Sequence, residues 1–444
     1  MPLVPFAALL LAPVTHPERP LRVVRTLLAA IGAVAAFVLY VELRKKFFPA
    51  PIDTSLVTEL APDAPWYSKA HHAFMEWFHQ PVLPKDPLNN PLAKADTPHR
   101  IGGALRVYWR GLTQIVVPKT LSGDYSFPQE PIPETVWFPE SILGAAMMVL
   151  PPLASLAIWV RSLFVEDRER SVAQRRGDVF ELSPAEVCWL LVGVGLTWIV
   201  VSYFPHSNIP AVLPTVRAER FWYFPAIGSS LVLAIAFVGL FHSTRHIQDG
   251  SIAVGLFTLF FTFQCGKAYQ HSTHYRDDLT FWSATRDAVP NSAKAHLNYS
   301  VMWGARGRLD IRRDANGRAL ELAPTWPMAH VYMGDTICRM HKPEEAWPYY
   351  ESGFKLADND PNLLSLGLQC MWDEQVIDEE GETVRSFKIH EAELTKMCDE
   401  RPGTWLNYLV RDMSINGETN NGVDPKYRPR GYNEGPKELE PRTV

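Results

Sequence analysis

Residues 206–228 of the 444-residue chain, HSNIPAVLPTVRAERFWYFPAIG, join two long apolar runs. They contain three prolines, the pair Arg217 and Arg220, Glu219 between them, and a closing aromatic cluster. Charges held this close to a bilayer are costly, so they indicate either an interfacial anchor or a functional site. Both interpretations make the chain a membrane protein, and both alternatives stay open at this point.

Five apolar runs have the length of a membrane-spanning helix, about 17 to 25 residues. They cover residues 27–43, 141–160, 185–204, 221–241 and 251–269. The second run contains Pro151 and Pro152, which a membrane helix tolerates with a kink. A shorter apolar run, residues 2–14, resembles the end of a span whose beginning is absent. We therefore expect the chain to be a truncated form of a longer one.

The basic residues of the short loops predict the orientation of the spans, because such loops stay on the cytoplasmic side. They place segments 19–25, 166–182 and 242–250 there, and segment 47–139, loop 205–220 and the C-terminal half on the opposite side. Arg44, Lys45 and Lys46 conflict with this rule. We accept the conflict because the arginines between positions 161 and 176 outweigh them, and because long loops cross the membrane largely regardless of charge.

The segment 47–139 contains two amphipathic stretches that predict helices in the membrane interface. In residues 104–117 the apolar positions follow helical spacing, and Arg106, Arg110 and Gln114 take the other face. Residues 66–80 have a similar stripe. There His72, Glu76 and His79 would share one helix face, but their spacing matches no established metal motif. Interfacial polar residues are the favoured interpretation, and we predict no metal site.

The C-terminal half shows a 34-residue internal repeat. Pro290 and Pro324, Ala295 and Ala329, and His296 and His330 are each 34 positions apart. This period with small residues at crossing positions is typical of tetratricopeptide repeats, in which neighbouring helical hairpins stack. We expect units at 290–323 and 324–357, and a degenerate third at 358–400. An unrelated helical bundle is the alternative. Cys338, Cys370 and Cys398 lie in this half, and their spacing does not show whether any two of them pair.

These patterns predict an all-α fold, in which a polytopic membrane helical domain precedes an extracytoplasmic tetratricopeptide α-solenoid. The divisions are 1–46 (a partial and a complete span), 47–139 (an extracytoplasmic loop with interfacial helices), 140–269 (four spans with the focal loop, 205–220), 270–400 (repeats) and 401–444 (a disordered tail). The net charge of -5 indicates no nucleic-acid partner. No nucleotide-binding glycine motif is present, and we predict no cofactor.

Three local patterns resemble the transmembrane-and-TPR O-mannosyltransferase-like family, which has the C-type glycosyltransferase fold. They are LSGDYS at 121–126, Ser207-Asn208 followed by AERFWYFPAIG at 218–228, and RDD at 276–278 followed by PNSAKAH at 290–296. The second pattern is the most specific of the three. The order of spans, loops and repeats is also similar to that of the family.

The resemblance implies a sugar donor of the polyprenyl-phosphate type and transfer to a protein hydroxyl. It implies that Arg220 holds the donor phosphate, since arginine binds phosphate in a bidentate way. Glu219 would fix Arg220 or contact a sugar hydroxyl, and Asn208 and Ser207 would hydrogen-bond the sugar. Asp124 would contribute through its loop, as a turn-forming residue rather than a base. The catalytic residue is unknown, because the family's acidic loop has no counterpart before residue 47.

Two functions follow. The first is a membrane glycosyltransferase, complete or truncated, in the bacterial inner membrane or the endoplasmic reticulum membrane. The second is a non-catalytic, membrane-anchored scaffold whose repeat groove binds a protein partner. A transporter is disfavoured, because the spans lack ionisable residues at their centres. The expected partners are the bilayer, a polyprenyl-phosphate sugar and a protein bound through the repeats.

Overall fold

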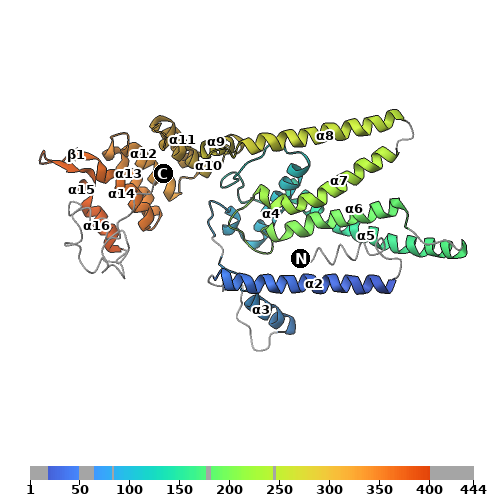
Figure 1. Ribbon diagram of the computed structural model, residues 1–444. Helices are drawn as coiled ribbons and strands as arrows, with labels where there is room; N and C mark the ends of the chain where they lie inside the picture. Colours follow the sequence, from blue (N-terminus) through green and yellow to red (C-terminus); the bar gives the residue numbers. More distant parts are fainter. Residues whose placement is uncertain (1–18, 50–64, 83–84, 177–181, 244–246, 401–444) are drawn as a thin grey trace. The chain divides into compact units, whose positions relative to one another are not determined.

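The computed structural model describes residues 19–49, 65–82, 85–176, 182–243 and 247–400. Helices dominate these residues (Figure 1). They form two compact units. The first holds the described residues up to Tyr125 and from Glu130 to Thr273, and the second holds Ser126–Gln129 and the described residues from His274 onward. The predictions for residues 2–14 and 401–444 lie outside the described part of the chain.

The first unit contains seven described helices longer than one turn. They are α2 (Arg19–Phe47), α3 (Trp66–Phe78), α4 (Thr97–Val116), α5 (Pro139–Arg176), α6 (Pro184–Tyr203), α7 (Tyr223–Ser243) and α8 (Ile247–Thr273), with short 3₁₀ turns η2 (Pro91–Lys94), η3 (Phe204–His206) and η4 (Glu219–Trp222). Within the described residues, five segments are long and apolar enough to cross a membrane: Val23–Phe47, Pro139–Arg176, Pro184–His206, Glu219–Phe241 and Ser251–Thr273. The protein is therefore an all-α polytopic membrane protein.

Helix α5 is longer than the sequence pattern predicts. The predicted span ends at 160 and a charged loop follows, but the helix continues to Arg176. Glu166 is buried and accepts a hydrogen bond from Arg170 Nε at 2.8 Å, one helical turn further on. Such pairs four residues apart stabilise a helix, and residues 166–176 of the predicted loop are helical. Pro151 and Pro152 lie inside α5, as expected for a membrane helix.

Helix α4 packs closely on α5. A Cβ atom added at Gly144 of α5 would lie 2.0 Å from the carbonyl oxygen of Leu105 in α4. No side chain fits there, so this glycine lets the two backbones approach. Leu105 and Tyr108, on the predicted apolar face of α4, are buried. Arg106 is buried too, so the predicted polar face does not simply point to water.

The second unit repeats a helical hairpin. Its elements are α9 (Asp278–Ala288), α10 (Ala293–Gly304), α11 (Leu309–Leu322), α12 (Pro327–Cys338), α13 (Pro343–Leu356), α14 (Pro361–Asp373), β1 (Gln375–Ile377), β2 (Thr383–Arg385), α15 (Ser386–Ile389) and α16 (Glu391–Glu400). The bounds of α12 and α13 equal those of α10 and α11 plus 34 residues. The same contact recurs in both hairpins, since His296 Nε2 lies 2.9 Å from the carbonyl oxygen of Pro290 and His330 Nε2 lies 2.7 Å from that of Pro324. Assignment to the tetratricopeptide class stays a prediction.

The segment after the second hairpin departs from the repeat. Helix α14 is followed by the antiparallel pair β1 and β2 and then by α15 and α16, where a third helical hairpin was expected. A disulfide joins Cys338 at the end of α12 to Cys370 in α14. The buried side chains of Tyr350 and Phe354 belong to the core at this end. The covalent link and this core fix α14 on the repeat.

Candidate functional site

The focal loop is shaped by Asn208, a buried residue in the left-handed region at φ 62°. Its Oδ1 accepts hydrogen bonds from Leu213 N and Asn90 Nδ2, both at 2.9 Å. Its Nδ2 donates to the carbonyl oxygen of Val216 at 3.1 Å. Asparagine tolerates this backbone conformation better than most residues do. The amide is therefore used to fold the loop, and its predicted contact with a sugar stays a prediction.

Ser207 is fully buried beside it. Its hydroxyl donates to the carbonyl oxygen of Phe204 at 2.7 Å and accepts from Ile209 N at 3.3 Å. These bonds close the turn that leaves α6. Like Asn208, Ser207 uses its hydrogen-bonding groups in contacts that shape the loop, and its predicted contact with a sugar stays a prediction.

The turn η4 presents Glu219 and Arg220 at the start of a candidate span. Its last residue, Trp222, is buried between Tyr108 and Tyr203, with ring centroids 5.4 and 4.2 Å away. The indole also needs Gly111, where an added Cβ would lie 2.0 Å from Trp222 Nε1. Aromatic packing of this kind adds about 0.5–1.5 kcal/mol per pair beyond area burial. Packing of Trp222 against α4 and α6 thus holds the turn in place.

Glu219 is held by three groups from outside its own turn. Its Oε1 accepts from the backbone N of Ser122 at 2.6 Å and from the Tyr125 hydroxyl at 2.9 Å. Its Oε2 lies 3.0 Å from His271 Nε2, near the end of α8. Ser122 and Tyr125 belong to the LSGDYS pattern. The structure therefore brings two of the sequence patterns together on one carboxylate.

Asp124 lies inside that same turn and is buried. The Ser122 hydroxyl donates to the backbone carbonyl of Asp124 at 2.9 Å, which closes the turn. Its neighbours Ser122 and Tyr125 contact Glu219. Its predicted contribution through the loop stays a prediction.

Arg220 is exposed, in contrast to its partner in the Arg-x-x-Arg pair. Its guanidinium carbon lies 5.3 Å from the centroid of the Phe221 ring. Among the residues that the structure describes, Arg220 forms no ion pair. An exposed guanidinium beside a fixed carboxylate keeps its hydrogen-bond donors available for an anion, and its planar fork matches a phosphate.

Arg217, three residues earlier, is buried and part of a charge cluster centred on Glu130. The Glu130 carboxylate is fully buried and lies 2.7 Å from Arg217 Nη1, 2.9 Å from Arg110 Nη1 and 3.4 Å from Arg106 Nε. Glu140 also pairs with Arg110, at 2.8 Å. Three cations against two carboxylates leave one positive charge. Burial lowers the pKa of Arg106 while Glu130 opposes this shift, and an arginine stays charged.

No sequence motif marks His271, Glu130 or Arg106 as belonging to this site. Glu130 joins residues from α4 and from the focal loop, and His271 joins α8 to η4, so their contacts depend on how the helices pack. Tyr125 could have been found, because it lies in the LSGDYS pattern. Burial raises the pKa of its hydroxyl, which keeps the group neutral as a donor to Glu219.

The contacts of His72, Glu76 and His79 in and beside α3 do not support a metal site. His72 Nδ1 lies 3.6 Å from Glu76, one turn away, and the backbone carbonyl of His79 accepts from Arg44. In the described portion of the chain, no group of three or more histidine, cysteine or acidic residues could hold a metal ion.

Comparison with known proteins gives one partial likeness. The chain is 27% identical over 127 residues to a protein O-mannosyl-transferase of Caenorhabditis elegans. The match covers 29% of this chain and 18% of that protein. The aligned region is therefore less than a fifth of the relative's length. No family model matches the chain, and no solved structure does. The likeness and the helix content fit a membrane protein of a glycosyltransferase-like kind.

Proposed function

We propose that this protein is a membrane glycosyltransferase that takes a sugar from a polyprenyl-phosphate donor and passes it to a protein hydroxyl. The observation that carries the proposal is the exposed guanidinium of Arg220 beside Glu219, itself held by Ser122, Tyr125 and His271. The pair stands at the start of a span, where the phosphate of a lipid-linked sugar would emerge. The relative named as an O-mannosyl-transferase supports the same class.

The chemistry assigns Arg220 to the leaving group. The acceptor hydroxyl oxygen forms a bond to the anomeric carbon, the bond from that carbon to the phosphate oxygen breaks, and the polyprenyl phosphate leaves with an added negative charge. Arg220 would bind the phosphate and stabilise that charge as it develops. The hydroxyl proton passes to a base that we do not assign to a residue of this chain. Glu219 acts by accepting a hydrogen bond from a sugar hydroxyl, because among the described residues it forms no ion pair with Arg220.

The C-terminal unit would present the acceptor protein through its repeated hairpins, which form the extended surfaces of solenoid proteins. The disulfide between Cys338 and Cys370 supports an extracytoplasmic position for this unit, since disulfides persist in oxidising compartments. An extracytoplasmic position for this unit also agrees with the orientation that the loop charges predict.

The test is transfer of radiolabelled mannose from a polyprenyl-phosphate donor by membranes that contain the full chain. Arg220→Ala should lower the rate by about 10- to 100-fold, the loss of one charged hydrogen-bond partner of roughly 1.5–3 kcal/mol. Arg220→Lys should retain part of the activity, because lysine keeps the charge and loses the bidentate geometry. Arg168→Ala is the matched control. Arg168 is also exposed, but it lies near the C-terminal end of α5, away from the candidate site.

Equal transfer by Arg220→Ala and the wild type would remove Arg220 from the site. Absence of transfer by the wild-type chain, with protein capture by the repeats intact, would favour the scaffold function instead. In that case substitutions in the repeat groove should abolish capture and Arg220→Ala should not.

A further inference from the structure

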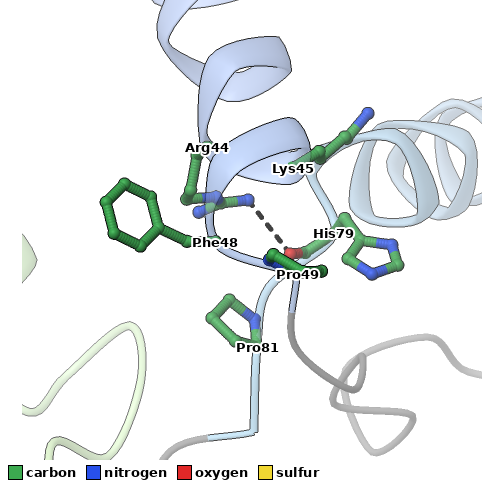
Figure 2. Close-up of a pocket in the computed structure, with 6 residues that line it drawn as sticks. All are labelled: Arg44, Lys45, Phe48, Pro49, His79 and Pro81. Atoms are coloured by element: carbon green, nitrogen blue, oxygen red, sulfur yellow. Dashed lines mark hydrogen bonds between the residues drawn. The ribbon is translucent and has the colours of Figure 1, made fainter.

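A hollow lies where α2 ends, on the opposite side of the predicted membrane from the basic loops. It has a volume of about 250 Å³ and is lined by Arg44, Lys45, Phe48, Pro49, His79 and Pro81 (Figure 2). The Arg44 side chain extends from α2 toward the carbonyl of His79, and the rings of Phe48 and Pro81 form the apolar walls. A cation framed by apolar rings in this way is suited to a ligand that is part anion and part hydrocarbon.

Within the described part of the chain, Arg44 is anchored through its Nη2 atom. Nη2 donates to the backbone carbonyl of His79 at 3.0 Å and to that of Phe78. The guanidinium carbon also lies 4.5 Å from the centroid of the Phe78 ring. With the residues that the structure describes, Nε and Nη1 of Arg44 form no hydrogen bond. The side chain is therefore fixed in position while two of its donors stay available.

The charge at this end of α2 is positive. Arg44, Lys45 and Lys46 follow one another, and among the described residues Glu42 pairs with Lys45, at 3.2 Å. This cluster is the one that conflicts with the positive-inside rule. A guanidinium fixed at the lipid surface on the unfavoured side is accounted for if an anion binds there.

Helix α3 places the hollow at the level of the lipid headgroups. The Phe37 ring of α2 stacks on Phe78 of α3, with centroids 6.0 Å apart, and α3 therefore attaches beside the end of α2. Trp66 and Tyr67 at the other end of α3 are exposed. Exposed tryptophan and tyrosine rings are typical of the membrane–water interface. Phe48, at the mouth of the hollow, is 77% exposed and can contact acyl chains.

We propose that the hollow binds the phosphate of an anionic phospholipid headgroup. Arg44 donates to a phosphate oxygen through the N–H groups of Nη1, in a charge-assisted hydrogen bond. Lys45 also lines the hollow, but it is paired with Glu42, so Arg44 makes the contact with the anion. The acyl chains run along the exposed apolar residues of α2, such as Leu39 and Leu43. A soluble phosphate could use only Arg44, so the apolar walls favour the lipid.

The test is retention of phosphatidylglycerol by the full chain in nanodiscs of phosphatidylcholine doped with that lipid, measured by native mass spectrometry. The wild type should retain one phosphatidylglycerol molecule. Arg44→Gln should lower retention at least fivefold. Lys46→Gln, which removes the same charge two residues further along α2 but does not line the hollow, should retain the lipid as the wild type does.

Arg44→Gln also removes the bonds to Phe78 and His79, so a second pair of variants separates binding from folding. Phe48→Glu puts a carboxylate at the mouth of the hollow and leaves those bonds intact, and it should abolish retention. Phe47→Glu, at an exposed neighbour outside the lining, should not. Equal losses in Arg44→Gln and Lys46→Gln would show diffuse surface charge and overturn the proposal. Displacement of the lipid by about 10 mM inorganic phosphate, a concentration at which the Debye length is still on the order of 30 Å and screening is weak, would identify a soluble-anion site and overturn it as well.

Discussion

His271 places its Nε2 atom 3.0 Å from Oε2 of Glu219, so the end of α8 is joined to the turn that begins α7. The side chains are only 17% and 24% exposed, and solvent screens such a pair less than a surface pair. The contact makes His271 a positioning residue for the carboxylate beside Arg220. It also links two spans at the candidate donor site.

We predict that His271→Phe raises the KM for the polyprenyl-phosphate donor about 5- to 20-fold, the loss of one hydrogen bond of roughly 1–2 kcal/mol. His271→Gln keeps an N–H donor and should retain most of the affinity for the polyprenyl-phosphate donor. Steady-state kinetics at varied donor concentration measures both. An unchanged KM in the phenylalanine variant would show that the pair only packs α8 against the loop.

The charge cluster around Glu130 gives a second prediction. This one carboxylate neutralises buried arginines from α4 and from the focal loop. Glu130→Gln leaves Arg106 and Arg217 buried without full compensation, which costs about 3–5 kcal/mol. The melting temperature of the detergent-purified protein should fall clearly. Glu134→Gln, an exposed carboxylate four residues away, is the control and should leave it unchanged. Equal melting temperatures for the two variants would contradict the role of Glu130 as the centre of the cluster.

The crossing of α4 and α5 depends on Gly144. Gly144→Ala forces its Cβ against the Leu105 carbonyl and should destabilise the protein by about 1–3 kcal/mol, the usual cost of overpacking. Gly239→Ala is matched to it, since Gly239 also lies in a candidate span but has open space around the added Cβ. Resistance to unfolding in sodium dodecyl sulfate should separate the two. A stable Gly144→Ala variant would mean that the helices are further apart than the structure has them.

The pH dependence of the repeat unit should involve His296. Burial lowers the pKa of its imidazole, the Pro290 carbonyl and Asp287 oppose the shift, and Arg286 and Arg318 add to it. The unfolded chain then binds the proton more readily, so the free energy of unfolding is at its full value above about pH 6.5 and falls as the pH drops toward the lowered pKa. Hydrogen exchange of α10 in the full chain, corrected for intrinsic rates, should show less protection at pH 5.5 than at 7.5.

The variant His296→Gln removes the titrating group and keeps a donor for the Pro290 carbonyl. Its protection of α10 should vary less with pH than that of the wild type. An identical pH dependence in the two proteins would assign the effect to another group.

Hydropathy predicted the spans well because a helix in lipid needs a continuous apolar run, whatever surrounds it. The 34-residue offset between the two hairpins was also predicted. Residues that recur at a fixed spacing indicate helices that recur at the same spacing. The end of α5 was not predicted. The pair of Glu166 and Arg170 continues that helix into charged sequence, and average hydropathy does not register a pair of opposite charges.

The roles of the candidate site residues stay predictions. Local patterns singled out Glu219 and Arg220, because both lie in one short stretch. They did not distinguish the buried Arg217 from the exposed Arg220, since that difference depends on Glu130, which is 87 residues from Arg217 in the sequence. The same limit applies to His271. Contacts between distant residues follow from helix packing, and a single sequence contains no direct signal for them.

Ser126–Gln129 belongs to the second unit although the residues on both sides belong to the first. The Ser126 hydroxyl lies 2.9 Å from that of Ser292, and the Phe127 carbonyl accepts from Ala293 N at 3.1 Å, so this tetrapeptide completes the start of α10. A fragment that begins at His274 therefore lacks a piece of its own fold. Dissecting the protein for biochemistry calls for complementation in trans, with a synthetic peptide of residues 122–130 added to the isolated fragment, rather than a single cut in the gene.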